Sequence, residues 1–223
     1  MLIDRGAQHH RSVWHSGYWL VIALIIVSYV FCAIQTGPEP SKFALLIQLA
    51  TVAATLRIAA KTTTVRNIGW TVVAVAAVAV TVAWLTGASG HVLDVLLSGA
   101  SMVAYLVAPV AIIVHQLRKN YVDAQTLLAM IAAYLMVGMF YTFTYNFIAV
   151  VMNVPIFGDG HTDSLTSELF FSFTTLTTTG YGNLVPVGPA VQGVAIAEAI
   201  TGQLFLVVAL AGVVSAYTRP GKR

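Results

Sequence analysis

The sequence Thr174-Thr-Leu-Thr-Thr-Thr-Gly-Tyr-Gly-Asn183 lies between two long apolar runs of the chain. Non-helical backbone is tolerated at membrane depth only where protein buries it or where it lines a watery cavity. Gly180 and Gly182 can adopt positive φ angles at no steric cost. Their alternation with Thr179 and Tyr181 would let successive carbonyl groups point toward one axis. A column of carbonyl oxygens can replace the hydration shell of a bare cation.

The composition of the chain is that of a membrane protein. Of its 223 residues, 58% are hydrophobic and 9% are charged, whereas soluble domains carry about 25% charged residues. The net charge of +3 comes from basic residues in connecting segments, so it does not indicate nucleic-acid binding. The single cysteine, Cys32, lies in an apolar run and excludes an intrachain disulfide. We expect no cleaved signal peptide, because the N-terminal segment lacks a short apolar core with a cleavage site.

Six apolar runs predict membrane-spanning helices, each of which needs about 20 residues. They are Tyr18–Ile34, Phe43–Ala60, Trp70–Leu85, Val92–Val114, Thr126–Met152 and Ala190–Tyr217. A polar connection, Asn153–Ser167, and a short helix, Glu168–Thr177, separate the last two runs. We expect Ser167 to cap this short helix, which cannot cross the membrane, and Glu168 to lie in its first turn.

The basic residues predict the orientation of the chain in the membrane. Ten of the eleven lysines and arginines lie on one side if the N-terminus is cytoplasmic, and only Lys42 lies on the other. Cytoplasmic loops carry the excess of basic residues in membrane proteins. We therefore expect an integral protein of the plasma (inner) membrane with both termini cytoplasmic. The Asn153–Ser167 connection is then external, and segment 174–183 dips in from outside.

The five residues Thr178-Thr-Gly-Tyr-Gly182 resemble the potassium-channel signature Thr-Val-Gly-Tyr-Gly, with Thr179 in place of valine. A Thr-rich run and a helix candidate precede them, Pro186 follows, and apolar helices flank the whole. The resemblance is specific over residues 130–217. It implies a filter in which K+ contacts the carbonyl groups of Thr178, Thr179, Gly180 and Tyr181, together with the Thr178 hydroxyl. The Tyr181 ring would point away from the ions and brace the filter.

One such loop cannot enclose an ion, so four copies around an axis, a homotetramer, are expected. The expected fold is all-α and transmembrane, with six membrane helices, a re-entrant pore helix and a filter. We divide the chain into a cytoplasmic segment (1–17), a four-helix peripheral domain (18–119), a pore domain (120–217) and a cytoplasmic tail (218–223). The expected partners are further copies of the chain, membrane lipids and K+. A separate regulatory subunit is a further possible partner. No cofactor is expected, apart from the K+ ions in the filter.

Three residues match positions that support the filter in potassium channels. Asn183 stands where many of these channels have an aspartate after the second filter glycine. In some relatives a glutamate on the pore helix and a nearby aromatic residue hold that aspartate; the matching positions here are Thr174 and Phe170. An acid–acid clamp behind the filter is therefore absent from this sequence. We expect Phe170, Phe171 and Phe173 to pack the short helix against the fifth and sixth spans.

The sixth span contains a glycine and an acid of interest. Gly202 lies near the place of a gating-hinge glycine in potassium channels, although a small residue at a helix contact is an equal alternative. Glu198 is an acid inside a span, where ionisable groups are rare. It either lies at the foot of the pore helix, bonded to a Thr or Tyr or exposed to cavity water, or locks the helix structurally. The residues expected to line the cavity or gate are Gln203, Leu206 and Leu210.

The fourth apolar run, Val92–Val114, contains no lysine or arginine. A voltage sensor needs several, because each charge moved contributes only about 2.3 kcal/mol per 100 mV. We therefore expect a potassium-selective channel that is not conventionally voltage-gated. A non-selective cation channel, a subunit of a potassium-uptake transporter, and a membrane enzyme or scaffold are alternatives. The intact Gly-Tyr-Gly, the single filter loop and the lack of a catalytic set of side chains disfavour them in turn, so we expect no enzyme.

Overall fold

The computed structural model of the chain describes residues 18–34, 42–59, 91–117, 124–153, 155–158 and 164–218, with scattered positions between 67 and 82. Most of the described residues are helical. Among them there is no strand, and only one isolated bridge, between Phe157 and Pro186, is of β type. The expected all-α fold is confirmed for this part of the chain.

The helices are α2 (Tyr18–Ile34), α3 (Lys42–Ala59), α5 (His91–Leu117), α6 (Ala124–Met152), α7 (Leu165–Leu176) and α8 (Pro189–Thr218). The apolar runs of the sequence predict all but α7 to within three residues at each end. The described positions between 67 and 82 are also helical. The predicted end of that span, at Leu85, lies outside the described residues.

Three stretches of the described helices are long and apolar enough to cross a membrane. They are Asp94–Gln116, Gln125–Met152 and Pro189–Ala209. Helix α2 is strongly apolar but shorter, with 17 residues. These helices make the chain a helical membrane protein, and the count of six spans stays a prediction.

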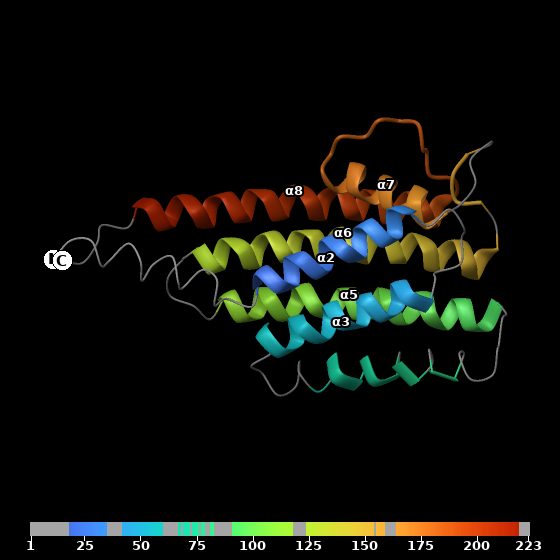
Figure 1. The fold of residues 1–223 in the computed structure, drawn as a ribbon. Helices are drawn as coiled ribbons and strands as arrows, with labels where there is room; N and C mark the ends of the chain where they lie inside the picture. The colour runs from blue at the N-terminus through green and yellow to red at the C-terminus, as the bar shows by residue number, and fades with distance from the viewer. Residues whose placement is uncertain are drawn as a thin grey trace.

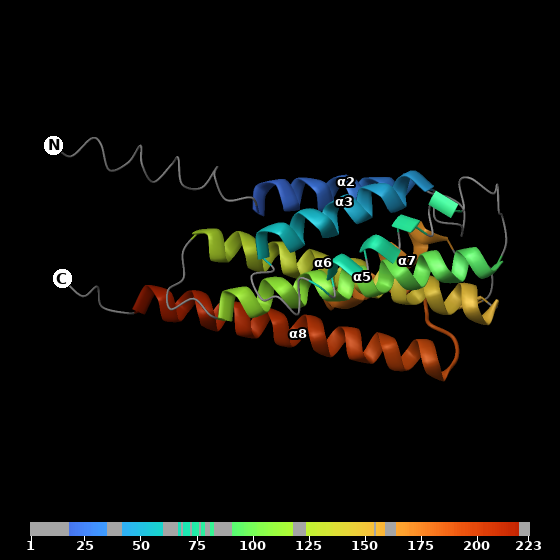
Figure 2. The same ribbon diagram turned by 90° about the horizontal axis from the view of Figure 1, so that it is seen from below.

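The long helices lie side by side along one axis (Figure 1, Figure 2). Helices α2 and α6 run in one direction, and α3, α5 and α8 run in the other. The short helix α7 lies at one end of the bundle, in contact with α6 and α8. The start of α2 and the end of α8 lie at the opposite end. The loop after α7 and the end of α8 therefore lie toward opposite ends of the bundle (Figure 1).

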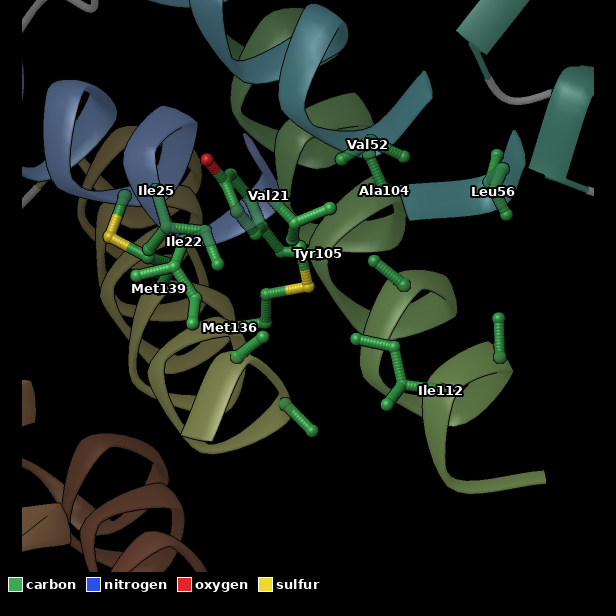
Figure 3. Packing of buried hydrophobic residues seen from close by; sticks show 14 of the residues in the cluster. Val21, Ile22, Ile25, Val52, Leu56, Ala104, Tyr105, Ile112, Met136 and Met139 are labelled. Carbon is green, nitrogen blue, oxygen red and sulfur yellow. The ribbon is translucent and has the colours of Figure 1, made fainter. Parts of the chain in front are cut away.

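One hydrophobic core joins the helices before residue 119 to those after it (Figure 3). Its members include Val21, Ile22 and Ile25 of α2, Val52 and Leu56 of α3, Tyr105 and Ile112 of α5, and Met136 and Met139 of α6. Leu165 and Leu169 of α7 belong to the same cluster. The first helices thus pack directly against α6 and α7, and they share one core with them.

Helix α8 contacts the rest of its own chain along one narrow stripe. The buried residues of this stripe are Val191, Ala195, Glu198 and Gly202. Their spacing of three to four residues places them on one face of the helix. Apolar side chains on the other faces, such as Ile196, Leu204 and Val208, are exposed. The described side chains of α8 outside this stripe are therefore exposed or half-buried, and they can meet lipid or another protein surface.

Candidate functional site

Helix α7 begins at Leu165, so the expected start and cap at Ser167 are wrong. Ser164 is the N-cap, with an extended backbone (φ −144°, ψ 152°). Its side chain accepts a hydrogen bond from the Ser167 N–H at 3.1 Å. Its carbonyl accepts one from the Glu168 N–H at 3.0 Å. Serine is a favourable N-cap residue at either position. The extended backbone at Ser164 makes this residue, and not Ser167, the N-cap.

Two of the three phenylalanines of α7 anchor the helix in the bundle, and Phe171 packs against the fifth span, α6, as expected. Phe171 is buried, with its ring centroid 5.1 Å from those of Tyr145 on α6 and Phe157. Phe173 meets the ring of Tyr29 on α2 edge-on, at a centroid distance of 5.4 Å. The second contact means that the first described helix of the chain touches α7 directly.

The expectation that Phe170 packs against the fifth and sixth spans is wrong. Its side chain is 39% exposed, and its ring stacks on that of Tyr181, with centroids 5.6 Å apart and an interplanar angle of 18°. The buried residues of α7, which include Leu165, Leu169 and Ser172, lie on one side of the helix, and Phe170 lies on the opposite side. Phe170 instead lies behind the aromatic residue of segment 178–182.

The backbone after α7 contains three positive φ angles in five residues: Thr178 (57°), Gly180 (52°) and Gly182 (77°). The two glycines adopt this conformation without a steric cost, as their positions in the sequence indicate. For Thr178 the conformation costs about 1–2 kcal/mol. Sequence reasoning missed it, because nothing in a threonine signals a left-handed backbone. Such strain is typical of functional sites.

The last turn of α7 sets the start of segment 178–182. The Thr174 carbonyl accepts hydrogen bonds from the N–H groups of Thr179 (2.8 Å) and Gly180 (3.1 Å). The Thr174 hydroxyl donates to the Phe171 carbonyl at 3.0 Å. Thr174, which the sequence singles out as a filter support, therefore contacts the segment through its main chain.

The chain returns from the glycine segment along the connection that precedes α7. The Gly158 N–H donates to the Val185 carbonyl at 3.1 Å, and the Val187 N–H donates to the Ile156 carbonyl at 2.8 Å. Residues 177–183, including Asn183, are all exposed, and the Tyr181 side chain is 71% exposed. A single chain holds the segment at both ends but leaves its middle uncovered.

Gly202 of α8 lies against the C-terminal end of α7. A Cβ atom at this position would clash with the Leu176 carbonyl oxygen. The same oxygen accepts a hydrogen bond from the Tyr134 hydroxyl of α6 at 3.2 Å. Gly202 therefore permits a close helix contact, which is the alternative to a gating hinge; the hinge stays a prediction.

Of the three residues predicted to line a cavity or gate, the structure describes the side chains of Gln203 and Leu206. Gln203 is exposed, and Leu206 is 47% exposed. The side chain of Leu210 lies outside the described residues. These positions leave the prediction for Gln203 and Leu206 open.

Of the alternatives for Glu198, exposure to cavity water is wrong, because this residue is fully buried within the chain. Its carboxyl group accepts hydrogen bonds from the Tyr145 hydroxyl of α6 and the Ser172 hydroxyl of α7, both at 2.6 Å. The bond to a tyrosine agrees with the sequence-based expectation, whereas the second partner is a serine and not a threonine. A buried carboxyl group needs such partners, because burying it without them is costly.

The C-terminal part of the chain matches a protein family. Residues 129–219, which include most of α6 together with α7, the glycine segment and α8, match the family model described as "Ion channel". This part of the chain is therefore similar to ion channels. The family is one of channels and not of enzymes, as the sequence predicts.

A curated relative supports the potassium-channel resemblance. A segment of 57 residues is 42% identical to the inward rectifier potassium channel Kirbac3.1 of Paramagnetospirillum magnetotacticum. The match covers 26% of this chain and 19% of the relative. The predicted resemblance to the pore-loop potassium channels is confirmed, and the chain spans only about a fifth of the length of this relative.

Phe170→Leu is expected to lower the stability of the pore domain by removing the ring that stacks on Tyr181. An aromatic pair contributes about 0.5–1.5 kcal/mol beyond its buried area. Phe170→Tyr keeps the ring, and its added hydroxyl has room because Phe170 is partly exposed. Chemical unfolding in detergent should therefore show a loss for the leucine variant only. Equal losses in both variants would contradict a role for the stack.

Proposed function

We propose that this chain is one subunit of a homotetrameric, potassium-selective channel of the plasma membrane. One observation supports the proposal most strongly. Segment 178–182, Thr-Thr-Gly-Tyr-Gly, follows directly from the C-terminal end of α7 in an ion-channel pore domain, and Gly180 and Gly182 have positive φ angles. This combination of a polar signature, a short preceding helix and left-handed glycines fits an ion filter better than an ordinary turn.

In the proposed filter, K+ is the cargo and moves through rings of carbonyl oxygens. The oxygens come from Thr178, Thr179, Gly180 and Tyr181, with the Thr178 hydroxyl at the inner end. They replace the water molecules that the ion leaves behind. The C-terminal end of α7 carries about half a negative charge, so four such ends would stabilise a cation on the inner side of the filter.

Two features of the single chain support the tetramer. Residues 177–183 are uncovered, although a carbonyl filter must be enclosed on all sides to exclude water from the ion. Helix α8 buries only one stripe against its own chain and exposes apolar side chains on its other faces. Cyclic symmetry is the common way for identical subunits to close such a ring. Four copies would cover both surfaces at once.

The proposed topology has six spans with both termini cytoplasmic. The directions of α2, α3, α5, α6 and α8 in the bundle support it, because they alternate as successive crossings require when one further span lies between α3 and α5 (Figure 1, Figure 2). The positive-inside rule then places the segment after α7 on the external side. The fourth span lacks basic residues between Val92 and Val114, so the proposed channel is not conventionally voltage-gated.

Flux measurements on the purified protein in liposomes test this function. We expect K+ flux down a K+ gradient and little Na+ flux down an equal Na+ gradient, because the carbonyl cage suits the larger ion. Chemical cross-linking of the same sample should give a limit of four chains. Equal fluxes of both ions would favour the non-selective alternative and make Thr179 and Asn183 the residues to examine. Absence of any flux from intact tetramers, at all membrane potentials and pH values tried, would contradict the proposal.

A further inference from the structure

The carboxyl group of Glu198 joins three helices at one point. It lies on α8 and accepts 2.6 Å hydrogen bonds from Tyr145 on α6 and from Ser172 on α7. The Ser172 hydroxyl also lies 2.8 Å from the Gly138 carbonyl oxygen on α6. All three bonded side chains are fully buried. In a membrane-embedded bundle, polar groups of this kind have no water to replace a lost partner.

This junction lies close to the residues that hold the filter. Ser172 precedes Thr174 by two residues, a rise of about 3 Å along a helix. The Thr174 carbonyl is the acceptor for the N–H groups of Thr179 and Gly180. A shift of α7 at Ser172 would therefore move the acceptor that sets the start of the filter.

Helix α8 contacts α7 a second time, four residues further along. Gly202 lies against the Leu176 carbonyl at the end of α7. The first contact, between Glu198 and Ser172, is directional and polar, whereas the second is a close steric fit. Together the two contacts define the position of α7 along α8 and its rotation about its own axis. Neither contact alone would do so, because a steric fit permits rotation and one hydrogen bond permits sliding.

We propose that Glu198 is a positioning residue for the filter: through Ser172 and Tyr145 it holds α7 in the register that discriminates K+ from Na+. The inference rests on the proposed channel function. The property affected is selectivity. A carbonyl cage that is displaced or loosened binds Na+, the smaller ion, more nearly as well as it binds K+. The stability of the folded channel is a separate property, and any buried hydrogen bond can contribute to it.

A second polar contact between α6 and α8 provides a matched control. The Tyr141 hydroxyl lies 3.0 Å from the Thr201 hydroxyl. This pair joins the same two long helices close to the Glu198 junction, but it does not include α7. Loss of this contact loosens the bundle without releasing the pore helix.

The test compares the K+/Na+ flux ratio per tetramer for Ser172→Ala, Tyr145→Phe, Glu198→Gln and Thr201→Val in liposomes. We expect the ratio to fall about tenfold in Ser172→Ala and in Tyr145→Phe, the factor that corresponds to one hydrogen bond to a carboxyl group. Thr201→Val should keep the wild-type ratio. Combining Glu198→Gln with Ser172→Ala should add little to the larger single effect, because both substitutions alter the same contact between Glu198 and Ser172.

Other outcomes of this experiment would overturn the inference. A wild-type ratio in Ser172→Ala and Tyr145→Phe tetramers would show that the junction only stabilises the fold. An equal fall in Thr201→Val would show that any loosening of the α6–α8 contact has the same effect. A wild-type channel that does not discriminate K+ from Na+ would overturn the proposed function, and with it this inference. The two failures are distinguishable because the second appears before any substitution is made.

Discussion

Gly180→Ala is expected to abolish potassium flux. Gly180 has a φ angle of 52°, in the left-handed region that a residue with a Cβ atom avoids. The strain is about 1–2 kcal/mol in each chain and roughly 4–8 kcal/mol in a tetramer. The proposed filter can relieve this strain by rotating the backbone at Gly180, which would turn a carbonyl group away from the proposed ion path. We therefore expect flux into liposomes to fall by at least about a hundredfold, since each 1.4 kcal/mol is a factor of ten.

Gly188→Ala is the matched control for this experiment. Gly188 also has a positive φ, 85°, and a Cβ atom there would meet nothing within 4 Å, as at Gly180. It lies outside the filter, directly before α8. The two variants share the backbone strain, so the control should lose stability but keep its K+ flux per tetramer. Wild-type flux through Gly180→Ala, or equal losses in both variants, would contradict the assignment of residues 178–182 as the filter.

Gly202→Ala is expected to destabilise the channel by about 1–3 kcal/mol per chain, the usual cost of inserting a methyl group into a close contact. The clash would be with the Leu176 carbonyl oxygen, which is main chain and also bonded to Tyr134. Relief of the clash requires α8 and the end of α7 to move apart, which displaces the residues that precede segment 178–182. The fraction of tetramer that survives heating, followed by size-exclusion chromatography, measures the effect, and K+ flux should fall with it.

Gly193→Ala provides the control on the same helix, since a Cβ atom there would meet nothing within 4 Å. An alanine inside a helix is favoured over glycine by about 1 kcal/mol, so this variant should be as stable as the wild type or more so. The hinge alternative predicts the same gain at Gly202, because a flexible glycine would be replaced by a helix former. A more stable Gly202→Ala channel with altered opening would therefore support the hinge and contradict the packing role.

The location of the candidate site could be proposed from the sequence because its signals are local. Segment 178–182 carries the signature in five consecutive residues, and the φ freedom of Gly180 and Gly182 is a property of glycine itself. The surroundings of the site could not be predicted in the same way. Phe170 and Phe171 are adjacent and of one type, yet one stacks on Tyr181 and the other is buried beside Tyr145. Helix phase and the position of neighbouring helices decide between them.

By itself, the sequence determined that the chain is a helical membrane protein, where most of its helices lie, and which loop resembles an ion filter. Those properties follow from the length of apolar runs and from residue types within a few positions of one another. Only the tertiary structure decided that Ser164 caps α7, that Gly202 meets the Leu176 carbonyl, and that Glu198 bonds to residues 26 and 53 positions away. The physical reason is that a buried polar or small residue acquires its role from the partner that packing brings to it, and that partner is remote in sequence.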